Sequence, residues 1–199
     1  MNTISSPRAA LPPFREAVSE LRDVLNRLDE LSAVVEGAGD LLTRTLDAGG
    51  KILTCGNGGS AADALHMAEE LIGRYLRDRR ALPSICLNSD VTALTCIGND
   101  YGFDRIFSRQ IEGLGKSGDV LVAFSTSGNS KNILLALETA REQGIATILL
   151  AGKDGGLAKS LCSHAIIVPS ETTARIQEVH TLIMHQWLEA IDLHFTSAK

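Results

Sequence analysis

The stretch DVLVAFSTSGNS, residues 119–130, decides the fold of this chain. In the run Asp119–Phe124, every residue after the aspartate is apolar, which is typical of a strand buried on both faces of a parallel sheet. A polar turn, Ser125–Ser130, follows at once, and Lys131–Gln143 then has the apolar spacing of a helix. A buried strand that passes through a short turn into a helix is the repeating unit of α/β proteins.

The same unit recurs on both sides of this stretch. Short apolar runs that predict four more strands lie at Lys51–Cys55, Ser84–Leu87, Ala146–Leu150 and Ala165–Val168. Helical sequence follows them, including Ala61–Ile72, which Ser60 is placed to cap, and a last helix from about Thr173 to Phe195. We therefore predict an α/β fold, a three-layer sandwich in which helices cover both faces of a five-stranded parallel sheet.

Residues 14–48 precede the first strand and have a helical apolar pattern. Gly37 and Gly39 are expected to divide this segment into two helices. The 199 residues suit a single domain, 1–199, with an N-terminal helical segment (1–50) before an α/β core (51–199). Amphipathic helices of this kind suit either assembly with other subunits or packing on their own domain, and the pattern does not separate the two.

The composition excludes several classes of protein. Hydrophobic residues make up 44% and charged residues 22%, as in ordinary soluble proteins. A formal net charge of −5 with 4% aromatic residues argues against a nucleic-acid partner, since such surfaces need surplus cations and stacking rings. Met1–Phe14 is broken by Pro7, Pro12 and Pro13, and no apolar run is long enough for a signal peptide or a membrane span. We therefore expect a cytoplasmic protein with no membrane partner.

The four cysteines are Cys55, Cys86, Cys96 and Cys162. No two of them have the two-residue spacing of a zinc knuckle or a redox pair. We expect them to be buried, reduced thiols.

Two of the strand-to-helix loops have unusual sequences. Ligands of such sheets bind beyond the carboxyl ends of the strands, where these loops lie. The loop Gly56-Asn57-Gly58-Gly59-Ser60 offers backbone N–H groups at a helix N-terminus, which suits an anion, although a tight turn that only needs glycine is an open alternative. Ser125–Ser130 brings four hydroxyls and an amide to a second helix N-terminus. This set suits a phosphate, because capping alone uses one hydroxyl.

A set of metal-ligand residue types lies on two of the predicted helices. His66 and Glu70 are four residues apart and share one face, as ligands or as an ordinary surface pair. On the last helix, His180 lies about 60° to one side of Gln177 and His185 about 80° to the other, so either histidine can face the same pocket. Gln177 and His185 are separated by a rise of about 12 Å, so both must lean inward, or one must come from another subunit. Four such N and O ligands suit zinc with one position open for substrate, whereas any single histidine is more often a packing residue.

Several motifs in this order resemble the phosphoheptose isomerases of the sugar isomerase (SIS) domain family. They are residues 55–60, 66–71, 98–103, 125–130, 153–156 and 175–178, and the resemblance covers nearly the whole chain after about residue 15. It implies a flavodoxin-like SIS fold. It also implies an aldose–ketose isomerase that converts sedoheptulose 7-phosphate to D-glycero-D-manno-heptose 7-phosphate through an enediolate, the first step toward nucleotide-activated heptose.

The resemblance also implies the site residues. The zinc ligands, for one ion per subunit of a homotetramer, would be His66, Glu70, Gln177 and His185. Glu70 and His185 would be the acid–base pair. The substrate contacts would be Asn57, Gly58, Gly59, Ser60, Glu70, Asn99, Asp100, Ser125, Thr126, Ser127, Ser130 and Gln177. Ala174 departs from the pattern, because some members have an acidic residue there, and the choice of His185 over His180 rests on the resemblance alone.

Two other functions stay open from the sequence. A non-enzymatic SIS protein, such as a regulator of replication initiation that binds a protein partner, would share the loops and the Arg175–Glu178 segment but would need no complete ligand set. An SIS isomerase or sensor for amino-sugar phosphates would use the same phosphate loops. The presence of all four metal-ligand residues favours the phosphoheptose isomerase over both of these alternatives.

Overall fold

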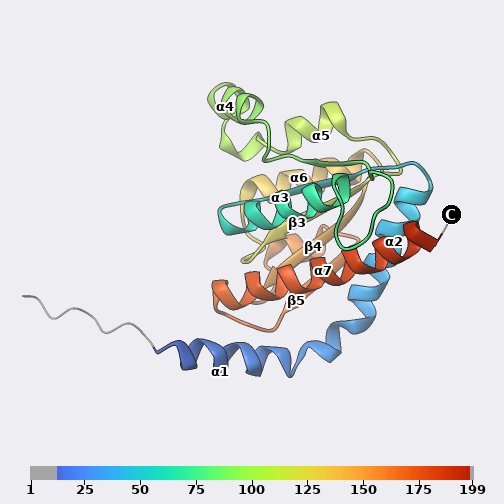
Figure 1. The fold of residues 1–199 in the computed structure, drawn as a ribbon. Helices are drawn as coiled ribbons and strands as arrows, with labels where there is room; N and C mark the ends of the chain where they lie inside the picture. Colours follow the sequence, from blue (N-terminus) through green and yellow to red (C-terminus); the bar gives the residue numbers. More distant parts are fainter. Residues whose placement is uncertain (1–12, 198–199) are drawn as a thin grey trace, which may run out of the picture.

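The structure is a computed structural model that describes residues 13–197, so that Pro7 and Pro12 lie outside the described residues. Five parallel strands form one sheet in the order β2-β1-β3-β4-β5. Figure 1 labels β3, β4 and β5 of this sheet among the surrounding helices. The strands are β1 (Ile52–Gly56), β2 (Ser84–Cys86), β3 (Val120–Ser125), β4 (Ala146–Gly152) and β5 (His164–Val168). The predicted five-stranded parallel sheet is therefore confirmed, and its strand order is the flavodoxin-like one.

The sheet has a hydrophobic core on each face, because successive side chains of a strand point to opposite sides. Val122 and Phe124 lie in the core that is covered by α2 (Ser32–Asp47), α3 (Gly59–Ile72) and α7 (Thr173–Ser197). Leu121 and Ala123 lie in the opposite core, which is covered by α4 (Val91–Asp100), α5 (Ser108–Leu114) and α6 (Lys131–Glu142). This is the predicted three-layer sandwich.

The N-terminal segment is divided at a different place from the one predicted. The break lies at Asn26–Leu31, where a short 3-10 helix (Leu28–Leu31) separates α1 (Phe14–Leu25) from α2, and α2 runs through both glycines. Gly39 is there for packing: a Cβ at this position would lie 2.9 Å from Cδ1 of Trp187 on α7. The Trp187 indole also donates to the Val35 carbonyl at 2.8 Å. The prediction that Gly37 and Gly39 divide the segment was wrong because glycine allows a close approach here rather than ending a helix.

The chain leaves β1 and β3 toward opposite faces of the sheet. α3, after β1, packs in the first core, and α6, after β3, packs in the second. Because β1 and β3 are neighbours, a crevice opens between the N-termini of these two helices. α3 begins at Gly59, after Gly58 at a φ of +55°, and no side chain caps it, so the prediction that Ser60 caps this helix was wrong.

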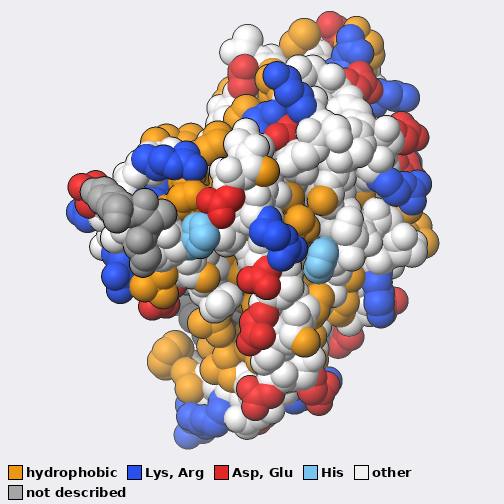
Figure 2. Space-filling view, turned by 90° about the vertical axis from the view of Figure 1, so that its right-hand side faces the viewer, with side chains coloured by type: hydrophobic (Ala, Val, Ile, Leu, Met, Phe, Trp, Pro, Cys, Tyr) orange, Lys and Arg blue, Asp and Glu red, His pale blue; other side chains and the backbone are white. Residues whose placement is uncertain are grey.

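All four cysteines are free, and Cys55 and Cys86 are buried, but Cys96 is exposed and Cys162 half-buried, so burial was predicted correctly for only two. Among residues 13–197, no helix is both long and apolar enough to cross a bilayer. On the face shown in Figure 2, basic and acidic side chains are interspersed, with hydrophobic ones between them.

Candidate active site

A cavity of about 240 Å³ lies in the crevice between the β1 and β3 loops. Most of its lining is polar and uncharged, and it comes from both loops and from the first turns of α7. The lining residues are Asn57, Gly59, Ser60, Phe124, Ser125, Thr126, Ser127, Ser130, Thr173 and Gln177. Among the described residues that line it, none is Lys or Arg. The cavity therefore offers hydroxyls, amides and two helix N-termini to an anion.

Ser130 is the N-cap residue of α6, but its side chain makes no capping hydrogen bond. The Ser125 hydroxyl accepts from Gly128 N at 3.2 Å, and that of Ser127 accepts from Asn129 N at 3.3 Å. Each of these hydroxyls still has a proton to donate. The loop can therefore donate hydrogen bonds to an anion in the cavity that it lines.

Two pairs of hydrogen bonds hold the first loop in place. Asn57 and Asn132 are joined amide to amide, with Asn57 Nδ2 donating at 2.9 Å and Asn132 Nδ2 donating back at 2.8 Å. Asn88 brackets Gly56 in the same way, accepting from its N–H at 3.1 Å and donating to its carbonyl at 2.9 Å. Neither Asn88 nor Asn132 was predicted from the sequence. The position of Asn88 just after a predicted strand was an available signal, whereas nothing local marks Asn132.

Gly59 and Gln177 are in close contact across α3 and α7. A Cβ at Gly59 would lie 2.5 Å from Gln177 Nε2 and 2.8 Å from its Oε1. The amide of Gln177 therefore lies at the N-terminus of α3, in the lining of the cavity. A side chain larger than that of glycine at position 59 would displace the Gln177 amide. Gln177 therefore lies with the polar residues that line the cavity, and not with His66 and Glu70.

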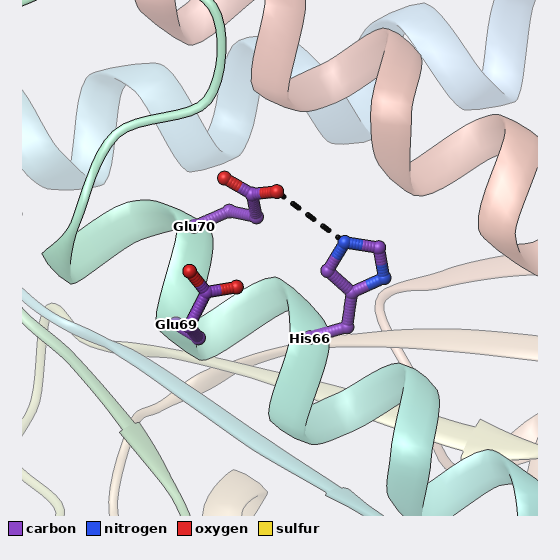
Figure 3. A group of neighbouring side chains, drawn as sticks. All are labelled: His66, Glu69 and Glu70. Carbon is purple, nitrogen blue, oxygen red and sulfur yellow. Dashed lines mark ion pairs between the residues drawn. The ribbon is translucent and has the colours of Figure 1, made fainter.

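His66, Glu69 and Glu70 form a cluster on α3 whose donor atoms all lie within 4.8 Å of one another (Figure 3). His66 Nε2 lies 3.4 Å from Glu70 Oε1, with the Glu70 side chain 17% and the His66 side chain 39% exposed. Two ligands of one tetrahedral zinc, each bonded at about 2.0–2.1 Å, are separated by about 3.3 Å. The pair therefore has the donor chemistry and the spacing of metal ligands. Glu69 was not predicted, although its place beside Glu70 in the sequence was a signal.

His185 lies beside this cluster. Its ring centroid is 5.1 Å from that of His66, nearly edge-on, and 5.4 Å from that of Tyr75, which stacks on it. Gln177 is eight residues earlier on α7, in the cavity. The structure thus brings His66 and Glu70 together and places His185 in ring contact with His66, although the donor atoms that lie within 4.8 Å of one another include Glu69 and not His185. Gln177 lies at the other end of the α3–α7 seam.

Asp63 occupies the middle of that seam. Its Oδ1 accepts from the Thr181 hydroxyl at 3.1 Å, and its Oδ2 is buried without a hydrogen-bond partner. Burial raises the pKa of this carboxyl group. Asp63 was not predicted as a site residue, because an aspartate inside an amphipathic helix gives no local sign that it faces another helix.

His180 has a different environment from His185. Its ring is fully buried, its Nε2 donates to the Ala151 carbonyl at 3.2 Å, and its centroid is 6.1 Å from the Phe124 ring. Burial lowers the pKa of His180 to about 4, so that it is neutral at physiological pH. It faces the sheet and not the His66–Glu70 pair.

Some predicted substrate contacts lie outside the cavity. Gly58 lines a neighbouring cleft of about 470 Å³ beside α4. Asn99 and Asp100 end α4, are exposed, and bond to each other at 2.7 Å from Nδ2 to Oδ1. Glu70 lies with His66 instead. Ala174 is exposed at the start of α7, next to Thr173 in the lining.

Comparison with known proteins identifies the family. Residues 17–152 match the SIS domain family. The chain is 50% identical over 176 residues to a phosphoheptose isomerase of Campylobacter jejuni, covering 88% of this chain and 95% of that protein. The chain belongs to the phosphoheptose isomerase family of SIS domain proteins. A phosphoheptose isomerase of Helicobacter pylori is 48% identical over 181 residues, covering 91% of this chain and 94% of that one.

Solved phosphoheptose isomerases have the same fold. The enzyme of Neisseria gonorrhoeae superposes with a TM-score of 0.81 at 43% identity, covering 90% of this chain and 95% of that one. That of Francisella tularensis superposes with a TM-score of 0.84 at 34% identity, covering 92% and 100%. These likenesses confirm the flavodoxin-like SIS fold that the sequence resemblance implied.

Proposed function

We propose that this protein isomerises sedoheptulose 7-phosphate to D-glycero-D-manno-heptose 7-phosphate, the first step toward nucleotide-activated heptose. One observation carries the proposal: α3 and α7 together carry both an anion-type cavity and a carboxylate–imidazole cluster. Gly59, Ser60 and Gln177 line the cavity, whereas His66 and Glu70 belong to the cluster and His185 lies beside it. A phosphorylated sugar needs both, one for its phosphate and one for its reacting carbons.

The cavity binds the phosphate without using a charged side chain. The hydroxyls of Ser125, Thr126, Ser127 and Ser130 and the N-termini of α3 and α6 converge on it. Neutral donors and helix dipoles favour a dianion locally although the net charge of the chain is −5. The phosphate so held fixes the distance of the sugar carbonyl from the cluster.

The cluster supplies the proton transfers. A base removes a proton from C1 of the ketose, C2 receives a proton, and the hydroxyl proton of O1 passes to O2, which leaves an aldehyde at C1. Glu70 and His185 are assigned this work as acid–base residues. Glu70 is shielded but not sealed from solvent, as a group that exchanges protons with a substrate must be.

The donor set fits zinc, which would polarise the substrate oxygens when bound. His66 and Glu70 would hold it with His185 and Gln177, of which Gln177 must swing from its contact with Gly59 or be supplied by a second subunit. Because a coordinated carboxylate is a weaker base than a free one, holding the metal and accepting the substrate proton would make opposite demands on Glu70. This chain's contribution is the spacing of the His66–Glu70 pair on successive turns of α3.

We further propose that the protein works in the cytoplasm as a homotetramer of single SIS domains. Exposed apolar side chains on α1 and next to α4 support assembly: Phe14 is 84%, Tyr101 54% and Phe103 65% exposed. Asn99 and Asp100, which the single chain leaves in solvent, would then contact substrate in a neighbouring subunit.

The test of metal dependence is turnover of sedoheptulose 7-phosphate before and after chelation, with zinc content measured in parallel. We expect activity to fall with zinc content and to return when zinc is restored. Full activity in protein stripped of metal would overturn zinc dependence.

A further inference from the structure

The segment between α3 and β2, residues 73–83, is anchored by a buried ion pair. Arg79 Nε donates to Asp192 Oδ1 of α7 at 2.7 Å, and the two side chains are 0% and 1% exposed. The guanidinium group also donates to the carbonyls of Glu70 at 2.8 Å and Leu71 at 2.9 Å. It thereby satisfies carbonyls that the end of α3 leaves without helical partners. The backbone that carries Glu70 is held by Arg79.

Asp192 uses its second oxygen on the same segment. Its Oδ2 accepts from the backbone N–H groups of Leu76 at 2.7 Å and Arg77 at 2.9 Å. These are the two residues that follow Tyr75. A buried carboxylate with this many donors is firmly fixed, because removing any one donor would leave a buried charge less well paired. The main chain next to Tyr75 is therefore tied to α7.

The Tyr75 ring covers the imidazole of His185. The two planes are 25° apart with centroids at 5.4 Å, and the imidazole in turn meets the His66 ring at 79°. Asp192 and His185 are seven residues apart on α7, two helical turns, so they lie on the same face. The segment that carries Tyr75 is thus anchored on the face of α7 that presents His185.

We propose that Tyr75, held by the buried Arg79–Asp192 pair, is a positioning residue that fixes the imidazole of His185 against the His66–Glu70 pair. The inference rests on the proposed function for the role of His185 as a ligand. The stacking on one face and the edge contact on another exclude most rotamers of the His185 side chain. Its imidazole is therefore already held in one orientation before a metal binds, and binding costs less conformational entropy. Outer groups that orient metal ligands typically contribute about 10- to 100-fold to metal affinity.

The test measures zinc affinity of the metal-stripped full-length protein by competition with a chromophoric chelator. We expect Tyr75→Ala and Tyr75→Leu to lower the affinity about 10- to 100-fold, since both lose the aromatic face and the second keeps apolar bulk. Tyr75→Phe keeps the ring and should stay within about twofold of the parent. Leu76→Ala, at the 59% exposed neighbouring side chain, is the matched control and should also be unchanged.

A double-mutant comparison separates positioning from a general effect on the fold. In a His185→Ala background, Tyr75→Ala should lower zinc affinity no further, because the group it positions is gone. An equal loss in both backgrounds, or an unchanged affinity in folded Tyr75→Ala and Tyr75→Leu, would overturn the proposal. Parent protein that turns over but binds no zinc would also overturn it while leaving the isomerase activity. Parent protein that binds zinc without turnover would overturn the proposed function, but the effect of Tyr75 on zinc affinity could still be measured.

Discussion

Asn57 and Asn132 are hydrogen-bonded to each other in both directions, at 2.9 and 2.8 Å, although 75 residues separate them in the chain. Asn57 belongs to the loop after β1 and Asn132 to the first turn of α6, so this amide pair joins the two walls of the phosphate-type cavity. Asn132 is only 2% exposed. The shape of the cavity therefore depends on a hydrogen-bonded pair of protein side chains and not only on the groups that would contact a ligand.

Replacing Asn132 should impair substrate binding. Asn132→Ala leaves the Asn57 amide without its partner, which costs about 1–3 kcal/mol and loosens the first loop. We expect KM for the sugar phosphate to rise about tenfold or more, with a smaller change in kcat. Lys131→Ala, at the 78% exposed side chain next to it, is the control and should leave KM unchanged. Steady-state kinetics of both variants check this, and equal KM values would contradict the role of the amide pair.

Gly59→Ala should reduce activity without unfolding the protein. The added Cβ would meet the end of the Gln177 side chain, which can swing away, and alanine is a better helix residue than glycine. We expect kcat/KM to fall about tenfold or more while Tm stays the same or rises. Gly113→Ala on α5, where a Cβ meets nothing within 4 Å, is the matched control. If the two variants were equally active, Gln177 would have no role at the cavity.

Glu70→Gln should be far more damaging than Glu69→Gln. The first removes the carboxylate that lies 3.4 Å from His66 Nε2 and is assigned proton transfer, so kcat should fall about 100-fold or more. The second changes an exposed carboxylate that the proposed ligand set does not use, and activity should stay within a few-fold. Undiminished turnover by Glu70→Gln would exclude Glu70 as a catalytic residue.

His180 should make the fold sensitive to acid. Its folded pKa is about 4 against 6.5 for an ordinary histidine, so below pH 6.5 the unfolded chain takes up a proton that the folded chain does not. This contribution to stability is complete above pH 6.5 and is lost as pH falls toward 4, about 2 kcal/mol of it by pH 5. Urea unfolding at pH 7.5 and pH 5 should show this loss in the parent. In His180→Gln, which does not titrate, the loss should be smaller by that amount, and identical losses would contradict the assignment.

Most of the fold was predictable because it depends on local patterns. Consecutive apolar residues marked all five strands, and the structure moved their ends by only one or two residues, as when β4 continues to Gly152 to pair with Val168. The role of Gly39 was not predictable, because its partner Trp187 lies about 150 residues further along the chain. Helical angles left His180 and His185 equivalent, and only packing against Ala151 on one side and Tyr75 on the other separated them.

The candidate site was predictable where one residue type does one job. Hydroxyls and glycines after β1 and β3 marked the cavity, since helix N-termini bind anions in many folds. The residues that hold those loops, Asn88 and Asn132, were not predicted, because their hydrogen-bond partners lie far away in the sequence and only the fold brings them together. The same is true of Arg79 and Asp192, which are charged residues that the sequence alone would place on the surface.

NMR of sedoheptulose 7-phosphate incubated with zinc-replete protein tests most directly whether this chain isomerises a sugar phosphate. We predict that signals of D-glycero-D-manno-heptose 7-phosphate appear and approach the same equilibrium mixture from either sugar, and that unphosphorylated sedoheptulose is not converted at a comparable rate. An unchanged spectrum with zinc-replete, folded protein would contradict the claim and would point to a non-enzymatic SIS protein.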